Sequence, residues 1–256
     1  MPGKHLVRVG KTADQLSQQI GTYIAEHSAA AIKARGRFSI GFSGGSLPKL
    51  ACGAIATDSS IEWAKWDVFF VDERCVPLDH NDSNFKSLQE HLLDKLSTPM
   101  PLTNIVAYDA TSPTPEAAAQ RYADALTAKV QPASPNTPPA FDLLLLGMGE
   151  DGHTASLFPG HALLEERTAL VAHILDSPKP PPQRITLTYP VIGAAREVAV
   201  VAAGGGKADL LSQILDKGHE GPEYPVERAG SREGTLKWFI DEPAAAKLDL
   251  AAMPTF

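Results

Sequence analysis

Four short apolar runs along the chain each end in a loop that is rich in glycine or in charge. The runs lie at residues 38–42, 67–71, 141–146 and 198–202. Segments with helical patterning separate them, and strands separated by helices pair in parallel through right-handed crossovers. The chain is therefore expected to form an α/β fold with one mainly parallel sheet. The four loops would then meet at the carboxyl ends of the strands, where such sheets bind ligands.

The other elements follow from periodicity and from residues that favour helix ends. Thr12 and Gln15 suit a capping box before a helix that Gly36 can end. Further helices are expected at 47–55, 84–96, 117–129, 208–215 and 244–248, and further strands at 185–189 and 236–240. The proline-rich stretch 131–139 is short and is expected to be a surface loop. We therefore expect a single domain over residues 1–256.

The charge balance excludes several classes of protein. With 30 acidic and 23 basic residues the formal charge is −7, which argues against a partner that is a nucleic acid or an anionic membrane. No apolar run approaches the ~18 residues of a membrane span, and the first residues do not resemble a signal peptide. Two cysteines form neither a disulfide framework nor a zinc cluster. A cytoplasmic protein is expected, with a small anionic substrate still possible.

The loop after the first run is Ser43-Gly44-Gly45-Ser46. Glycines between a strand and a helix let backbone N–H groups face an anion, and the helix N-terminus adds partial positive charge. The segment is a candidate phosphate-binding loop, and a tight turn with Ser46 as an ordinary N-cap explains it equally well. It also matches the G-x-S-x-G pattern, which would make Ser43 an esterase nucleophile. That interpretation is weaker, because the pattern follows one short strand near residue 40.

The second and third loops supply candidate catalytic groups. Asp72 and Arg74 end one strand, where a carboxylate can accept a proton or orient neighbours and a guanidinium can hold an oxyanion. Between them, Glu73 is expected to form a local salt bridge at the rim of the sheet. His153 stands in a glycine-rich loop, where its imidazole can take a proton from water near neutral pH. Asp151, two residues earlier, could fix the tautomer of that ring.

Two cations complete the candidate site. Arg184 follows a proline cluster and Lys207 follows three glycines, so both can reach a phosphate, although solvated surface charge is the alternative. Neither a P-loop nor a dinucleotide-binding glycine pattern is present in the sequence. The acidic residues and the histidine between residues 72 and 82 match no zinc or calcium spacing, so no metal is expected.

Taken together, these segments resemble the glucosamine-6-phosphate isomerase/6-phosphogluconolactonase family, and most of all its lactonases. The resemblance extends from about Phe38 to Asp241, and its most specific part is DGHTASLFPG at 151–160. It implies a three-layer α/β sandwich with a mainly parallel, Rossmann-like central sheet, related to glucosamine-6-phosphate deaminase. It further implies hydrolysis of 6-phospho-D-glucono-1,5-lactone, the second step of the oxidative pentose phosphate pathway, without a cofactor.

On this hypothesis the loop at 43–46, with Arg184 and Lys207, holds the 6-phosphate. His153 activates the water that opens the lactone, Arg74 stabilises the oxyanion, and Asp72 orients Arg74 or the water. In the deaminase a glutamate lies five positions after the histidine, and this chain has Phe158 at that position. The loss of this carboxylate argues against a ring-opening isomerase reaction. A sugar-phosphate sensor would tend to lose the histidine and gain a DNA-binding segment. A monomer or weak dimer is expected.

Overall fold

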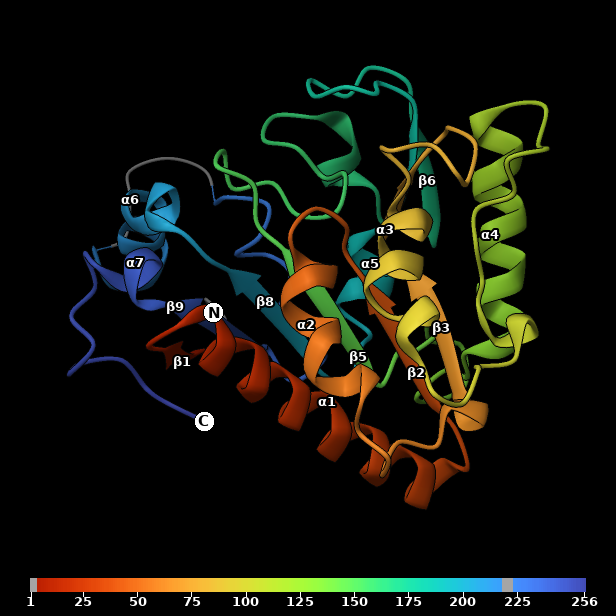
Figure 1. Ribbon diagram of the computed structural model, residues 1–256. Helices are drawn as coiled ribbons and strands as arrows, with labels where there is room; N and C mark the ends of the chain where they lie inside the picture. Colours follow the sequence, from red (N-terminus) through yellow and green to blue (C-terminus); the bar gives the residue numbers. More distant parts are fainter. Residues whose placement is uncertain (1–3, 218–222) are drawn as a thin grey trace.

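The computed structural model describes residues 4–217 and 223–256, and it forms an α/β sandwich (Figure 1). Within those ranges the larger sheet has six strands in the order β1-β9-β8-β5-β2-β3, and every neighbouring pair is parallel. This confirms the expected mainly parallel sheet. The strands are β1 (Lys4–Gly10), β2 (Phe38–Phe42), β3 (Trp66–Phe70), β5 (Leu143–Gly147), β8 (Val198–Ala202) and β9 (Thr235–Asp241).

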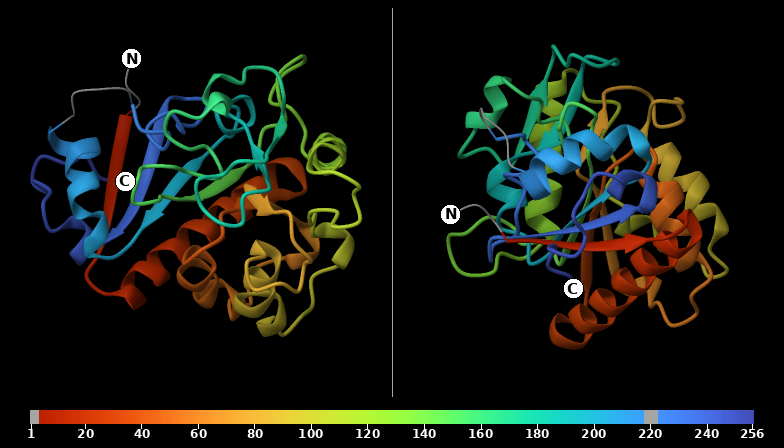
Figure 2. Two further views of the ribbon diagram at one scale, coloured as in Figure 1. Left: turned by 90° about the horizontal axis from the view of Figure 1, so that it is seen from above. Right: turned by 90° about the vertical axis from the view of Figure 1, so that its left-hand side faces the viewer.

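Helices cover both faces of this sheet and give three layers (Figure 2). One face carries α1 (Ala13–Arg35), α2 (Leu47–Ala56) and α3 (Asn84–His91). The other carries α4 (Pro115–Lys129), α5 (Tyr189–Ile192), α6 (Ala208–Ser212) and α7 (Glu242–Ala245). Side chains alternate across each strand, so Leu143 and Leu145 enter the first core while Leu144 and Leu146 enter the second.

A smaller antiparallel sheet stands beside the main one, in the order β4-β7-β6. Its strands are β4 (Asp72–Arg74), β6 (Val171–Ile174) and β7 (Arg184–Leu187). The expectation that 185–189 joins the parallel sheet was wrong. After β3 the chain passes Val71 and continues directly into β4, and β7 pairs with the free edge of β4 instead of joining the parallel sheet. The N–H of Leu187 donates to the Val71 carbonyl at 2.7 Å.

Most helix boundaries agree with the sequence patterns, and a few differ at their ends. Thr12 Oγ1 accepts from the N–H of Gln15 at 3.1 Å, and Gly36 ends α1 with φ 79°. The helix expected over 84–96 ends at His91, and the one expected from 208 changes to a π-helix. Irregular turns complete the chain: 3-10 helices at Trp63–Lys65, Leu93–Lys95, Leu102–Asn104, Ala162–Glu165 and Gly205–Lys207, and the π-helix at Gln213–Lys217.

Over the described ranges, no helix combines the length and the apolar character that crossing a bilayer would demand.

Candidate active site

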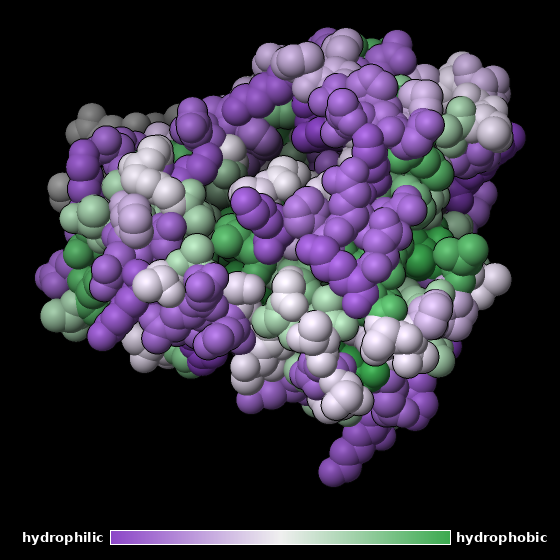
Figure 3. Space-filling model, in the orientation of Figure 1, coloured by the Kyte–Doolittle hydropathy of each residue, from purple (hydrophilic) through white to green (hydrophobic). Residues whose placement is uncertain are grey.

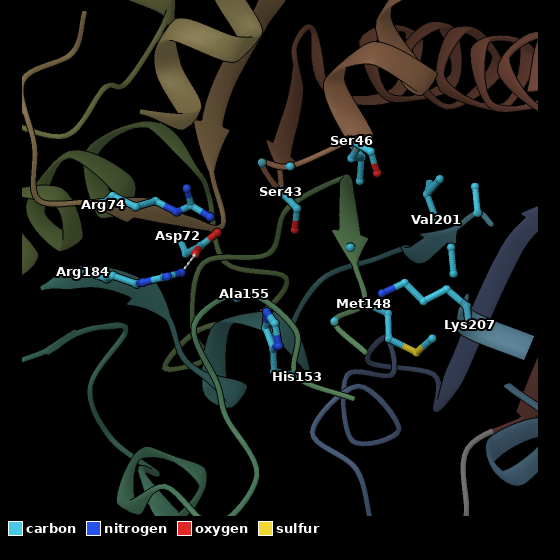
Figure 4. A pocket seen from close by; sticks show the side chains of 17 residues that line it. Ser43, Ser46, Asp72, Arg74, Met148, His153, Ala155, Arg184, Val201 and Lys207 are labelled. Atoms are coloured by element: carbon cyan, nitrogen blue, oxygen red, sulfur yellow. Dashed lines mark ion pairs between the residues drawn. The ribbon is translucent and has the colours of Figure 1, made fainter. Parts of the chain in front are cut away.

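A pocket of about 160 Å³ opens at the carboxyl ends of β2, β5 and β8 (Figure 4). Hydrophilic residues gather over the loops above these strand ends (Figure 3). The structure brings nine of the ten predicted site residues to this one pocket: Ser43, Gly44, Gly45, Ser46, Asp72, Arg74, His153, Arg184 and Lys207. The tenth, Asp151, stands behind His153 and bonds its ring. The predicted meeting of these loops at one pocket is confirmed, and the role of each residue stays a prediction.

The loop at 43–46 has donors directed to this pocket. The N–H of Ser43 is used to tie the loop to β5, through the Leu145 carbonyl at 2.9 Å. Its hydroxyl is buried and has no hydrogen-bond partner among the described residues, so it is available to a ligand. Ser46 occupies the N-cap position of α2, as the alternative expected, but its side chain makes no capping bond. Gly45 has φ +66°, a conformation that favours glycine.

Gly44 is in close contact with Asn84, the first residue of α3. A Cβ at position 44 would lie 1.7 Å from Asn84 Oδ1, while Asn84 Nδ2 donates to the Asp72 carbonyl at 2.9 Å. One amide thus joins the candidate phosphate loop to β4. Sequence reasoning missed Asn84, because no local pattern marks a contact between residues 44 and 84.

Replacing Gly44 with alanine is expected to push Asn84 away from Asp72. We expect a loss of about 1–3 kcal/mol in the free energy of unfolding, measured by urea denaturation, together with weaker anion binding. Gly53→Ala is the matched control, because position 53 is exposed in α2 and a Cβ there would lie 4.0 Å from Ser17 Oγ, the nearest atom outside its own helix. That variant should keep or gain stability. Equal stability of the two variants would contradict a tight 44–84 contact.

His153 is presented by a tight turn after β5. The N–H of Gly149 donates to the His153 carbonyl at 2.9 Å, and Gly152 has φ +77°. The imidazole lies directly over Gly149, where a Cβ would come within 2.0 Å of Nδ1. The ring points into the space between Asp72 and Lys207 (Figure 4). Glycine at 149 is therefore a steric requirement for this position of the ring.

Asp151 sets the tautomer of that ring. Its Oδ1 lies 2.5 Å from His153 Nδ1, so we assign the ring proton to Nδ1 and the free lone pair to Nε2. Burial lowers the pKa of His153 below its ordinary value, against the opposing effect of Asp151. Burial thus favours the neutral imidazole, which can accept a proton at Nε2.

Asp72 has different partners from those expected. Its side chain is buried, and Oδ2 accepts from Ser156 Oγ at 2.7 Å and pairs with Arg184 Nη1 at 3.8 Å. It was expected to orient Arg74 or a water molecule. The β4–β7 register explains the partner found, because Arg184 lies directly opposite Arg74 and diagonally across from Asp72.

The two arginines differ in how many donors remain for a ligand. Arg184 is 2% exposed and bonds three successive carbonyls of residues 177–183, hereafter the strap. Its Nε donates to Pro181 at 3.0 Å, and its Nη2 to Lys179 at 2.8 Å and Pro180 at 3.1 Å. Arg74 donates from Nη1 to the Asp82 carbonyl, while its buried Nε has no hydrogen-bond partner among the described residues. Arg74 is therefore the guanidinium with donors to spare.

Lys207 approaches the pocket from the opposite side, at the start of α6 (Figure 4). Burial lowers the pKa of its ammonium, and the nearby Glu150 raises it. It forms no ion pair with any residue that the structure describes. A partly desolvated cation that forms no direct ion pair within the described residues is suited to an incoming anion.

Glu73 does not form the expected salt bridge. It is 1% exposed, and its carboxyl group accepts from the N–H groups of Arg74, Asn84 and Phe85, each at 2.8 Å. Burial raises its pKa to about 7, although these bonds lower it. Glu73 therefore fastens β4 to the start of α3. Among the described residues, no cluster of three or more histidine, cysteine or acidic side chains could hold a metal ion.

Comparisons with known proteins agree with this architecture. The structure of a monomeric glucosamine-6-phosphate deaminase superposes with a TM-score of 0.73 at 17% identity, covering 94% of this chain and 99% of the other. That likeness defines the fold class: an α/β sandwich of the deaminase type. The 6-phosphogluconolactonase of Trypanosoma brucei superposes with a TM-score of 0.81 at 31% identity, covering 96% and 99% of the two chains.

Sequence comparison narrows the class to a family. Residues 11–238 match the family model of glucosamine-6-phosphate isomerases/6-phosphogluconolactonase. The 6-phosphogluconolactonase of Rattus norvegicus is 42% identical over 254 residues, which cover 97% of this chain and 96% of the relative. The chain belongs to the glucosamine-6-phosphate isomerase/6-phosphogluconolactonase family.

Proposed function

We propose that this chain is a cytoplasmic enzyme that hydrolyses 6-phospho-D-glucono-1,5-lactone to 6-phospho-D-gluconate, the second step of the oxidative pentose phosphate pathway. Its lactonase relatives, similar over nearly the whole chain, support this activity. The observation that carries the proposal is spatial. The imidazole of His153 and the loop at 43–46 line one pocket of about 160 Å³.

The phosphate anchors the substrate at one end of the pocket. Ser43 Oγ and the N–H groups of Gly44 and Gly45 donate to its oxygens, and Lys207 neutralises its charge. This binding is remote from the reacting carbon, so its free energy is used to orient the lactone carbonyl toward His153. Arg184 contributes through its charge and by holding the strap.

His153 carries out the proton transfers. Its Nε2 takes a proton from the water whose oxygen attacks the lactone carbonyl carbon. The tetrahedral intermediate then collapses, the bond from that carbon to the ring oxygen breaks, and Nε2 returns the proton to the departing oxygen. Asp151 stabilises the imidazolium between the two transfers through the Nδ1 contact at 2.5 Å. An activated ester needs no covalent nucleophile, so Ser43 remains a binding group.

The oxyanion is stabilised by Arg74. Its guanidinium borders the pocket, where its N–H groups can donate to the oxygen that gains charge. Asp72 and Arg184 form the fixed wall behind it, held together by Ser156. In this account Asp72 positions neighbours and gives up no proton.

The deaminase reaction is the nearest alternative within the family. In that enzyme a glutamate lies five positions after the histidine; here the position is Phe158. The Phe158 ring packs against the His153 imidazole at a centroid distance of 4.6 Å. A phenyl ring at position 158 packs against the imidazole and cannot relay a proton, as a glutamate there could. His153 is therefore better suited to activating water for hydrolysis than to the deaminase reaction.

The test is to incubate the purified protein separately with 6-phosphogluconolactone, glucono-1,5-lactone and glucosamine 6-phosphate and to measure the rate of each reaction. We expect hydrolysis of the phosphorylated lactone well above its spontaneous rate, much slower hydrolysis of the unphosphorylated lactone, and no ammonia from the amino sugar. Proton release measures the first two reactions, and an ammonia assay measures the third. Ammonia release without lactone hydrolysis would replace our proposal with the deaminase alternative.

A further inference from the structure

The strap brings one more cation to the catalytic pair. Lys179 Nζ lies 3.5 Å from Asp151 Oδ1, the same oxygen that bonds His153 Nδ1 at 2.5 Å. One carboxylate oxygen is thus shared between an imidazole from the turn after β5 and an ammonium from the strap. The sequence patterns did not single out Lys179, because it stands in a proline cluster that has no catalytic signature.

The backbone of Lys179 is held in place from within the site. Arg184 Nη2 donates to its carbonyl at 2.8 Å, and Ser177 Oγ donates to the same carbonyl at 2.8 Å. The N–H of Lys179 in turn donates to Ser177 Oγ at 3.2 Å. The buried Arg184 also pairs with Asp72, so the backbone of Lys179 is tied to the pocket wall. The position of Lys179 is therefore built into the site.

We propose that Lys179 is a positioning residue of the lactone-opening reaction, which shares Asp151 with His153 and holds this carboxylate beside the imidazole. The inference rests on the proposed function for its role in catalysis. Lys179 is not among the described residues that line the pocket, and its ammonium meets the catalytic pair only at Asp151. It acts through Asp151.

The positive charge of Lys179 reduces the effect of Asp151 on the pKa of His153. A carboxylate bonded to an imidazole raises the pKa of that ring and so favours the protonated form, which cannot act as a base. The ammonium of Lys179 opposes this and favours the neutral ring. The groups that act on His153 are Asp151 and Asp72, which raise its pKa, and Lys179, which together with burial lowers it. Lys179 thus extends the range of pH in which Nε2 can accept a proton.

The test compares Lys179→Met, which keeps the length and removes the charge, with Lys179→Arg, which keeps the charge. Lys33→Met, at an exposed position of α1, is the matched control. We expect the acidic limb of kcat/KM to move to higher pH in Lys179→Met, with a loss of about threefold or more at pH ~5.5 relative to pH ~8. Lys179→Arg should restore the profile. The Lys179–Asp151 pair is well exposed, at 43% and 37%, so its removal should leave the fold intact.

A second readout is independent of catalysis. Titration of the His153 ring by nuclear magnetic resonance should show a higher pKa in Lys179→Met than in the parent or in Lys33→Met. An unchanged or lower pKa of His153, or superimposable pH profiles, would overturn the role of Lys179 even in an active lactonase. If the parent fails to hydrolyse the lactone while the His153 pKa still rises, the proposed function fails and the Lys179–Asp151–His153 coupling stands.

Discussion

Replacing His153 with asparagine is expected to lower kcat/KM for 6-phosphogluconolactone by about 10²-fold to 10⁴-fold, the usual contribution of a positioned general base. Asparagine retains a polar side chain near Asp151 and loses the basic Nε2. Rates are measured by proton release, with the spontaneous hydrolysis subtracted. The loss should fall mainly on kcat, because His153 acts on water and on the ring oxygen and not on the phosphate.

His173→Asn provides the control for this substitution. His173 lies in β6, outside the residues that line the pocket, and like His153 it is partly buried. Its variant should keep the parent rate, and circular dichroism should show both variants folded. Retention of near-parent activity in a folded His153→Asn variant would remove the imidazole from the mechanism and return attention to Ser43 as a nucleophile.

Replacing Lys207 with methionine is expected to reduce the preference for the phosphorylated substrate. A charge-assisted hydrogen bond to a phosphate contributes about 1.5–3 kcal/mol, so kcat/KM for 6-phosphogluconolactone should fall by about 10-fold to 100-fold. The slow hydrolysis of glucono-1,5-lactone should change little, since that substrate offers no phosphate to the ammonium. The ratio of the two kcat/KM values isolates the contribution of the contact between the Lys207 ammonium and the phosphate.

Lys33→Met serves again as the comparison, because it removes one positive charge far from the pocket and so reports only the long-range change in charge. A fall of equal size on both lactones in Lys207→Met would place the ammonium near the reacting carbon and not at the phosphate. In that case Ser43 and Arg74 would be the groups to examine as the anion site.

The sequence predicted the position of the site better than its internal connections. Apolar runs ending in polar loops identified β2, β3, β5 and β8, and parallel pairing then required their loops to share one edge. Ser43 and His153 were brought together by that argument alone. Composition and periodicity are local signals, and they are sufficient for elements whose strands are buried on both faces.

What the sequence did not predict depends on contacts between distant residues. Ser156 bonds Asp72 across 84 positions of the chain, and Asn84 meets both Gly44 and Asp72 through its side chain. The antiparallel partner of β4 follows from the direction in which the chain leaves β3. Arg184 was correctly placed at the pocket, but its use of donors on the strap carbonyls was not foreseeable from its neighbours in sequence.

The passage of β3 into β4 has a consequence for how the enzyme meets its substrate. Arg74 and Arg184 are register partners on paired strands, so their guanidinium groups have a backbone spacing that exists before any ligand arrives. Binding an anion between these two strands therefore costs less conformational entropy than binding by a flexible loop would. We therefore expect the pocket to bind its substrate without a large conformational change. Solution structures with and without phosphate should differ little along these two strands.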